Sequence, residues 1–443
     1  MFLSCIHIYG QRNCGSQLNL MELQQTDTAR YRRIMDLENR IQKFLNGPVL
    51  RSGSLQSTIY IPVVVHIVYK TNAENISDAQ VYSQIQVLNE DYRRLNVDKT
   101  NTPSAFASLA GDANIEFVLA KTDPFGNSTT GITRTFTTQT QFYPPNYEND
   151  PNGDGVKFLV LPWNTDRYLN IWVCNLGDLS QDGGLKGYAQ FPDQFYTNPF
   201  TDGVVINYQC FGREGSALDP RYNKGRTATH EIGHWLGLRH IWGDDDKEDG
   251  SCPSHDCCWG SDEVNDTPNQ ETRNYKCPSF PKTDACSPVS PGVMFMNYMD
   301  YSDDACMNMF TNGQIERMRA VFYAQRLTML GYSNCYNGIQ DPTETGIDCG
   351  CMCPPCDVVT PPPSSFKLDE YWIRNSIVNE PMKIEVRITN LSNANIGTNV
   401  RWELRINKYP NDFKSDYLCS DNDFIYCETG YSNVYSFNLI NHY

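Results

Sequence analysis

The sequence is short of positive charge and has no long apolar run. Of its 443 residues, 36 are Lys or Arg and 52 are Asp or Glu, which leaves a net charge of −16. Nucleic-acid-binding proteins normally show the opposite excess, gathered in patches, so that class is nearly excluded. The longest apolar stretch, around Ile61 to Tyr69, is far shorter than the ~20 residues of a membrane-spanning helix. We therefore expect a soluble protein with no membrane span.

Charged residues make up only 20% of the chain and apolar residues 40%, so we expect folded domains, about two to four of them, rather than disorder. The start at Met1 to Gly10 lacks the basic region and the small-residue cleavage site of a signal peptide, and we expect the true start to lie upstream. Cysteine is plentiful, with 17 residues, which indicates disulfides in a secreted protein. Because 17 is odd, at least one thiol stays unpaired in a monomer.

Residues 1–51 read as a polar leader, in which Arg30 to Phe44 has helical spacing. The β-branched run Ile61 to Tyr69 predicts a buried strand. Ser77, with Gln80 placed for a capping box, predicts the start of a helix. The apolar face of that helix would consist of Val81, Ile85, Leu88, Tyr92 and Leu95.

Further strands and one more helix are predicted before residue 333. The strands are Ile115 to Ala120, Tyr168 to Asn175, Gly187 to Phe191 and Val204 to Tyr208. A capped helix begins at Thr311, with Gln314 in its capping box, and ends at Gly331. Its buried face would carry Ile315, Met318 and Phe322. Strands mixed with long helices predict an α/β or α+β domain over residues 52–333.

The C-terminal part divides into three segments by composition. Residues 334–357 form a Cys-rich module, in which a disulfide knot is favoured over a second zinc site. Residues 358–365 contain three consecutive prolines and form a linker. In residues 366–443, Lys383 to Ile388 and Val400 to Ile406 alternate apolar and polar residues, which predicts an Ig-like β-sandwich. This last segment is short for seven strands, so we expect the sandwich to be incomplete in this chain.

One motif carries most of the chemistry. Residues 230–240 read His-Glu-Ile-Gly-His-Trp-Leu-Gly-Leu-Arg-His. His230 and His234 are four apart, so on a helix both imidazoles face one cation. Gly237 allows the chain to turn, which brings His240 back as a third ligand. Three neutral imidazoles with an open fourth position suit Zn²⁺ better than iron.

Glu231 lies beside the two helical histidines, close enough to touch a metal-bound water without being a ligand. It would take the proton of that water during attack on a peptide carbonyl and pass it to the leaving amine. A donor for the developing oxyanion is still required. Outside the motif, His66 lies in an apolar strand and is expected to be a hydrogen-bonded core residue, whereas His255 lies in a Cys-rich loop and carries no assignment.

The long motif resembles that of the metzincin metalloproteases, and Asn297 to Tyr301 looks like the Met-turn of that clan. Together with Asp303 to Met307, these segments resemble the pappalysin family within it. The resemblance covers roughly residues 55 to 331. It implies a catalytic domain with a twisted mixed sheet, an active-site helix and a C-terminal helix. It also implies a secreted zinc endopeptidase that acts on proteins or peptides and is made as a latent zymogen.

The same resemblance implies roles for individual residues. Met299 would form the floor beneath the zinc site, and Tyr301 would stabilise the oxyanion. Gly187 to Phe191 would pair with extended substrate, although a plain edge strand remains the alternative. Cys14 would occupy the fourth metal position in the latent state until the leader is removed near Arg51. The unpaired thiol could equally be Cys5, Cys174 or Cys210.

A calcium site and two disulfides are also implied by likeness to the family. The candidate calcium ligands are Asp262, Asn265 and Thr267, in a loop that taken alone is simply acidic. The candidate disulfides join Cys277 with Cys306 and Cys258 with Cys286, which leaves Cys252 and Cys257 unassigned. Asp150 to Gly155 resembles a calcium loop only superficially, since its twelfth position is Leu161, and it is interpreted as a turn.

Substrate preference is less well defined than the reaction. Family members that cleave before Arg or Lys carry an acidic residue next to the Cys after the Met-turn, and here that position is Ala305, with Asp303 and Asp304 just before it. A basic preference is therefore only a hypothesis. Two other functions remain open: a non-catalytic adhesion protein whose C-terminal sandwich binds a surface ligand, and a different metal-dependent amide hydrolase.

Overall fold

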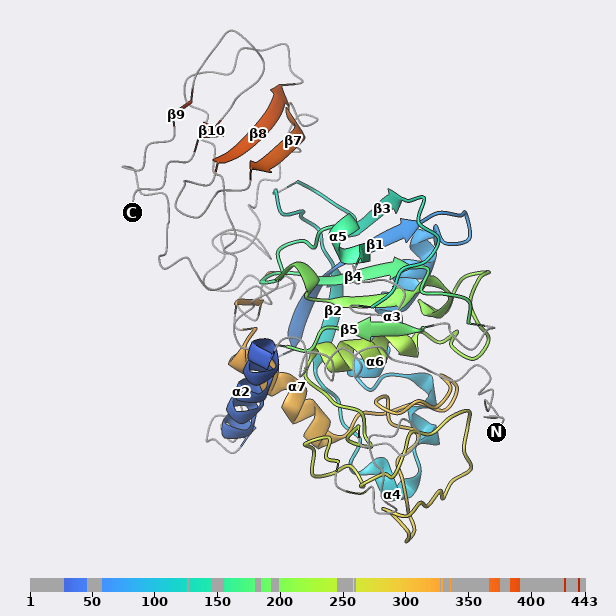
Figure 1. The fold of residues 1–443 in the computed structure, drawn as a ribbon. Coiled ribbons are helices and arrows are strands. Elements are labelled where there is room, and N and C mark those ends of the chain that lie inside the picture. The colour runs from blue at the N-terminus through green and yellow to red at the C-terminus, as the bar shows by residue number, and fades with distance from the viewer. Residues whose placement is uncertain are drawn as a thin grey trace, which may run out of the picture. The chain divides into compact units, whose positions relative to one another are not determined.

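A computed structural model describes the protein (Figure 1). The described residues are 28–45, 58–125, 127–144, 155–179, 185–192, 199–244, 258, 260–326, 328–329, 335, 366–374, 383–390, 426–427 and 437–438. The chain divides into two compact units, residues 1–356 and residues 357–443.

The first unit contains six named α-helices and six strands among its described residues. The helices are α2 (Thr28–Leu45), α3 (Asp78–Tyr92), α4 (Ser104–Ala107), α5 (Gly155–Leu159), α6 (Arg226–Trp235) and α7 (Asn312–Ala324). The strands are β1 (Ile59–Tyr69), β2 (Ile115–Leu119), β3 (Ile132–Phe136), β4 (Leu169–Cys174), β5 (Gly187–Ala189) and β6 (Val204–Asn207). Short 3₁₀ turns lie at Val97–Asn101, Pro199–Thr201 and Tyr208–Cys210.

The six strands form one mixed sheet in the order β2-β1-β4-β6-β5, with β3 also paired to β1. All pairings are parallel except that of β5 with β6, which is antiparallel. Strand β1 is long enough to pair with β2 along Ile59–Val63 and with β3 along Val65–Tyr69. The mixed sheet predicted for this domain is therefore confirmed, and β5 lies at its end next to α6 (Figure 1).

Alternation along β1 sends its side chains into two different cores. Its odd-numbered residues, such as Val63 and Val65, pack with residues of α3 and α6, including Leu88 and Ile232. Val68, on the other face, packs with residues of α5, β4 and β5. Both faces of β1 are covered, which explains why its sequence is an almost unbroken apolar run. Helix α6, which carries the first part of the histidine motif, therefore lies against a fully buried face of the sheet.

His66 projects from β1 among buried residues, as predicted for a core histidine. Its Nδ1 lies 2.8 Å from the hydroxyl of Thr133 and its Nε2 lies 3.1 Å from the Asn170 side-chain oxygen. Burial lowers the pKa of His66 to about 4, so the ring is neutral at physiological pH. Neither nitrogen is directed at the metal motif.

Helix α3 begins as predicted and ends earlier than predicted. The Ser77 side chain accepts a hydrogen bond from the backbone N–H of Gln80, so the cap is present. The Gln80 side chain instead donates to the carbonyl of Phe211, so the reciprocal half of the capping box was wrongly predicted. Leu95 is also a wrong prediction: the helix stops at Tyr92, and Leu95 is 62% exposed.

Helix α7 has the full capping box predicted at its start, with Thr311 and Gln314 bonded reciprocally. Ile315, Met318 and Phe322 are buried, as predicted. The helix ends at Ala324 rather than at Gly331, because Gln325 already leaves the helical conformation. Strand β3 was missed from the sequence, since its residues are only half-buried and polar residues interrupt them.

The second unit contains two antiparallel pairs, β7 (Phe366–Arg374) with β8 (Lys383–Asn390) and β9 (Tyr426–Cys427) with β10 (Phe437–Asn438). The strand predicted at Lys383 to Ile388 corresponds to β8. The strand predicted at Val400 to Ile406 lies outside the described residues, as do the Cys-rich module beyond Cys335 and the Pro-rich linker. In the part of the chain that the structure describes, no helix meets the length and apolarity needed to cross a bilayer.

Candidate metal centre

Helix α6 carries the first part of the motif and ends in a turn that depends on Gly237. The backbone N–H of Gly237 donates to the carbonyl of His234, and that of Leu238 donates to the carbonyl of Gly233. These two bonds form the Schellman arrangement, in which the residue after the cap is left-handed. Gly237 has φ of +84°, a conformation that costs a residue with a Cβ but not glycine. The turn reverses the chain and returns His240 toward the helix.

The three predicted histidines converge. His230, His234 and His240 are buried, and one nitrogen of each lies within 4.8 Å of the others. The Nε2 atom of His234 is 3.2 Å from that of His230 and 3.1 Å from that of His240. Tetrahedral ligands at ~2.0–2.1 Å from Zn²⁺ lie about 3.3 Å apart, so this spacing fits one zinc ion.

The other ring nitrogen of each histidine is held by an oxygen that accepts a hydrogen bond. The Nδ1 of His230 donates to the carbonyl of Tyr298 over 2.7 Å, and that of His234 donates to the carbonyl of Leu238 over 2.8 Å. The Nδ1 of His240 lies 2.5 Å from a carboxylate oxygen of Asp244. With protons on Nδ1, all three Nε2 lone pairs face the common centre, as a metal ligand requires. Burial and His240 also lower the pKa of His234 well below its ordinary value.

Glu231 is buried beside this centre, next to the start of β5. A Cβ added to Gly187 would lie 2.9 Å from the Cγ of Glu231 and 3.0 Å from the carbonyl oxygen of Val205. Any larger residue at position 187 would therefore press on the Glu231 side chain, since the backbone on the other side is fixed by the sheet. Gly187 was predicted as part of a substrate strand, and its close approach to Glu231 was not anticipated.

Met299 and Tyr301 both lie close to the histidine motif. A Cβ added to Gly233, on α6, would lie 2.5 Å from the Met299 sulfur, so the thioether packs directly beneath the helix. The Tyr301 ring is 5.0 Å from the ring of His240 and 5.8 Å from that of His230. Trp242, which the sequence did not single out, stacks on His240 at 4.3 Å with its plane tilted by only 7°.

The candidate calcium loop brings two of its three residues together. Both carboxylate oxygens of Asp262 accept from the hydroxyl of Thr267, at 3.0 and 2.8 Å, and burial raises the pKa of Asp262 to about 7. Asn265 is exposed. Among the described residues, the histidine trio is the only group of three or more His, Cys, Asp or Glu with metal-binding spacing. The calcium site therefore stays a prediction.

The two disulfides implied by likeness are present, Cys258 with Cys286 and Cys277 with Cys306. The second joins the loop below the centre to the segment that follows Tyr301. Cys14, Cys252, Cys257 and His255 lie outside the described residues. Cys174 is a free cysteine buried in β4, and burial raises the pKa of its thiol. Cys210 is also buried and outside any disulfide. These two thiols leave fifteen cysteines, an odd number, so a further cysteine must stay unpaired in a monomer.

The acidic residues after the Met-turn differ in their surroundings. Asp304 is buried, and its Oδ2 accepts from the backbone N–H groups of Lys224 and Arg226 at 3.0 and 3.1 Å. It therefore holds the start of α6 rather than lining a substrate pocket with a free carboxylate. Asp303 is partly exposed, and its backbone N–H donates to the carbonyl of Lys276.

Comparison with known proteins gives this geometry a family. Residues 157–323 match the peptidase family described as pregnancy-associated plasma protein-A. An extracellular metalloprotease of Pyricularia oryzae is 32% identical over 272 residues, which are 60% of this chain and 76% of that protein. One of Arthroderma benhamiae is 31% identical over 294 residues, 65% of this chain and 88% of that protein.

The chain belongs to the pappalysin family. It is a secreted metallopeptidase, as the motif and the cysteine content predicted. Two solved structures from Tannerella forsythia are similar to this pappalysin. A promirolysin mutant is 56% identical to this chain with a TM-score of 0.62, and the match covers 73% of this chain and 98% of the promirolysin chain. Mature mirolysin in complex with a cleaved peptide has 60% identity and a TM-score of 0.56, covering 63% and 98%.

Asp244 is expected to support metal binding in this pappalysin without being a ligand. Replacing it in Asp244→Ala removes the acceptor of the His240 Nδ1 proton, and loss of such partners typically weakens metal binding by about 10–100-fold. Competition with a chromophoric chelator measures the dissociation constant for Zn²⁺. Asp112→Ala, which removes an exposed carboxylate, is the control and should leave the constant unchanged. Equal zinc affinity in both variants would contradict this role.

Gly187→Ala is expected to displace the Glu231 carboxylate while leaving the histidines in place. A misplacement of about 1 Å can cost on the order of 100-fold in rate, so kcat should fall by about that factor at unchanged zinc content. Gly155→Ala is the matched control, because a Cβ there meets only Phe142, at 4.0 Å. Peptide cleavage assays and metal analysis of both variants check this. A Gly187→Ala enzyme of normal kcat would show that the carboxylate has room to move.

Proposed function

We propose that this protein is a secreted zinc endopeptidase in which His230, His234 and His240 hold the metal and Glu231 moves the proton. The proposal rests on the convergence of three Nε2 atoms. In each of these three imidazole rings the proton is on Nδ1, where an oxygen accepts it. Family membership supports zinc as the ion and a peptide bond as the substrate.

Zinc, when bound, would lower the pKa of a water molecule and polarise the scissile carbonyl. The Glu231 carboxylate would accept the proton of the attacking water and deliver it to the leaving amine. Tyr301, whose ring lies beside His230 and His240, would donate its phenol hydrogen bond to the developing oxyanion. The buried site lowers the local dielectric, which strengthens both contributions.

The substrate would bind as an added strand on β5. This strand ends the sheet, runs antiparallel to its neighbour and lies against α6, so an extended peptide paired with it would pass the histidines. The complex of mature mirolysin with a cleaved peptide supports peptides as the substrate class. A preference for Arg or Lys after the scissile bond stays a hypothesis, since Asp304 is committed to α6.

The leader would keep the enzyme latent. Helix α2 packs against α7 (Figure 1). It also borders the turn of the metal motif, since a Cβ added to Gly237 would lie 3.9 Å from the Cδ1 atom of Ile41. Its Leu37 and Ile41 are buried against Ala320 and Val321 of α7. Cys14 is proposed to occupy the fourth metal position, and the similarity to promirolysin supports a zymogen. Cleavage near Arg51 would then release the leader.

One buried arginine connects this leader helix to the metal motif. The Arg317 guanidinium forms two hydrogen bonds with the Glu38 carboxylate and donates through Nε to the carbonyl of Gly237 over 2.8 Å. The side chain of Arg317 is 2% exposed and that of Glu38 is 15% exposed. Docking of α2 is therefore coupled to the turn that places His240.

The remaining assignments are proposals of domain organisation. We infer a prosegment over residues 1–51, a catalytic domain over 52–333, a Cys-rich module over 334–357, a linker over 358–365 and an Ig-like sandwich over 366–443. The family match within residues 157–323 and the unit boundary after Cys356 are compatible with these limits. Calcium at Asp262, Asn265 and Thr267 belongs to this proposal, as does a surface ligand for the sandwich.

Glu231→Ala is expected to abolish turnover without emptying the site. General acid–base groups contribute about 10²–10⁴-fold, so casein cleavage by the leader-free protein should fall by at least ~100-fold, and a chelator should abolish wild-type activity. Glu214→Ala, which removes an exposed carboxylate, is the control. Undiminished casein cleavage by Glu231→Ala would refute the mechanism. A wild-type protein with bound zinc but no cleavage of any protein would favour the adhesion alternative.

Glu38→Gln is expected to loosen the leader and remove a pH dependence. Burial alone raises the pKa of Glu38, but its bonds to Arg317 outweigh this and hold the pKa below its ordinary value of 4.5. The contribution of the charged carboxylate is therefore complete above pH 4.5 and is lost as the pH falls through the lowered pKa. Hydrogen bonds to a charged group are worth about 1.5–3 kcal/mol, which is the expected loss of docking free energy in the variant.

Hydrogen exchange of residues 28–45, measured in a Glu231→Ala background to prevent self-cleavage, reports this docking. Protection of the wild-type amides should decrease as the pH falls from about 5 to about 3, a range that includes the ordinary carboxyl pKa of 4.5. In Glu38→Gln the same amides should be weakly protected at every pH. Asp36→Asn, on an exposed position of the same helix, is the control. Identical pH profiles for the Glu38 variant and the wild type would exclude the Arg317 contact as the determinant.

A further inference from the structure

A single buried carboxylate at the end of α3 joins two segments that border the metal centre. Asp91 is 3% exposed. Its Oδ1 accepts a hydrogen bond of 2.7 Å from the phenol of Tyr298, and its Oδ2 accepts one of 2.8 Å from the hydroxyl of Thr229. Thr229 belongs to α6 and Tyr298 to the segment before Met299, so three separate parts of the chain meet at one side chain.

Both partners of Asp91 are adjacent to the proposed zinc ligand His230. Thr229 directly precedes it in the helix, and its carbonyl accepts from the buried phenol of Tyr92 over 3.0 Å. The carbonyl of Tyr298 accepts the Nδ1 proton of His230 over 2.7 Å. The Asp91 carboxylate therefore fixes two things at once: the backbone next to His230, through Thr229, and the carbonyl that orients the His230 ring, through Tyr298.

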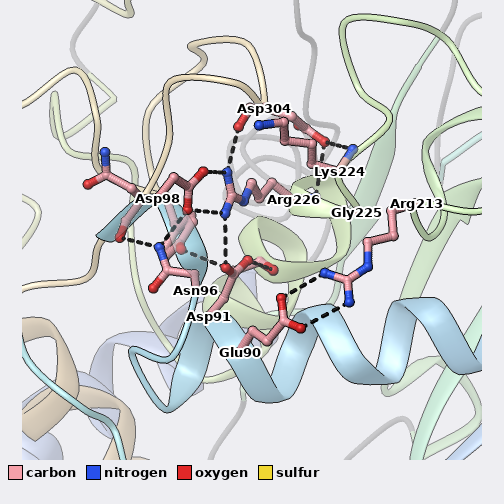
Figure 2. Close-up of polar contacts among 12 residues, drawn as sticks. Glu90, Asp91, Asn96, Asp98, Arg213, Lys224, Gly225, Arg226 and Asp304 are labelled. Atoms are coloured by element: carbon pink, nitrogen blue, oxygen red, sulfur yellow. Dashed lines mark hydrogen bonds and ion pairs between the residues drawn. The ribbon is translucent and has the colours of Figure 1, made fainter. Parts of the chain in front are cut away.

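The charge of Asp91 is balanced at the start of α6. Figure 2 shows the Arg226 guanidinium directed at Asp91, Asp98 and Asp304. Its Nη2 atom lies 3.3 Å from the Oδ1 atom of Asp91. The two terminal nitrogens donate to the Asp98 carboxylate at 2.6 and 2.8 Å, and Nη1 also donates to the carbonyl of Asp304 at 2.8 Å. Arg226 also lies 5.7 Å above the Tyr298 ring. Buried charges arranged in this way are strongly destabilised when one partner is removed, so the contacts resist rearrangement.

We propose that Asp91 is a positioning residue for metal binding, which acts through the Tyr298 phenol to hold the carbonyl that orients His230. The proposal rests on the proposed function only in taking His230 as a zinc ligand. A histidine that binds a metal depends on the hydrogen-bond partner of its other ring nitrogen for the orientation of the ring. For His230 that partner is the backbone carbonyl of Tyr298, and Asp91 can fix this carbonyl only through its bond to the Tyr298 side chain. The alternative is that this hydrogen-bond network stabilises the fold and has no effect on metal binding.

Tyr298→Phe separates these two roles, because it removes one hydroxyl and leaves the carbonyl and the ring. We expect a zinc dissociation constant raised by about tenfold, the lower end of the effect of outer-shell partners. In the cobalt-substituted protein the ligand-field bands should shift, since the His230 ring is less firmly oriented. In peptide cleavage kcat should fall while KM stays near its original value, because β5 is untouched.

Tyr168→Phe is the matched control. It also removes a buried hydroxyl, one that donates to the carbonyl of Thr122 over 2.9 Å on a different face of the sheet. Both variants should lose comparable thermal stability, but only Tyr298→Phe should bind zinc more weakly. Asp91→Asn, combined with Tyr298→Phe, should weaken zinc binding no further than the larger single effect, because both changes break the same contact.

Two results overturn the proposal in different ways. If both phenylalanine variants lower the melting temperature alike and leave the zinc constant and the cobalt spectrum unchanged, Asp91 has only a structural role. If the wild-type protein itself binds no zinc, the proposed function fails together with this inference. Chelator competition measures zinc binding without proteolysis, so the test also works if the wild-type protein binds zinc but is inactive. If Asp91→Asn does not fold, the comparison of Tyr298→Phe with the wild type decides the role of Asp91 by itself.

Discussion

Metal binding at the three histidines depends on which nitrogen of each imidazole ring carries the proton. An imidazole can present Nε2 to a cation only when its remaining proton is on Nδ1, and in this protein each Nδ1 faces an oxygen: two backbone carbonyls and the Asp244 carboxylate. Three lone pairs that converge with 3.1–3.2 Å between nitrogens repel one another unless a cation lies between them. The surrounding fold is therefore built to maintain an arrangement that is unfavourable until metal binds.

Buried arginines hold the active-site helix at both ends. Arg226 ties the start of α6 to Asp91 of α3 and to Asp304, in the segment after Tyr301. At the other end of α6, Arg326 forms two bonds of 2.9 Å with Asp202 and lies 3.7 Å from the Trp235 ring. Arg317 holds the turn that follows. Breaking a buried ion pair costs about 3–5 kcal/mol, so the helix cannot shift without losing several such contacts. Rigidity at the histidines is thus supplied by charge as well as by packing.

Local sequence patterns predicted much of the fold and of the metal site, whereas the contacts between distant residues were not predicted. The spacing of the motif places His230, His234 and His240, and the capping box at Thr311 starts α7, because both signals act within a few residues. Strand β3 was missed because it is half-buried, and Leu95 was misplaced because the helix ends before it. The contact of Gly187 with Glu231 and the bond between Asp91 and Tyr298 join residues far apart in the chain, which a single sequence does not reveal.

The order in which these parts are synthesised has a consequence for metal loading. The three imidazoles come from one stretch of eleven residues, but the carbonyl that fixes the first ring belongs to a residue 68 positions later. A nascent or unfolded chain therefore offers rings with unassigned tautomers and low affinity for zinc. Full zinc affinity therefore requires that the segment around Tyr298 has already folded against α6.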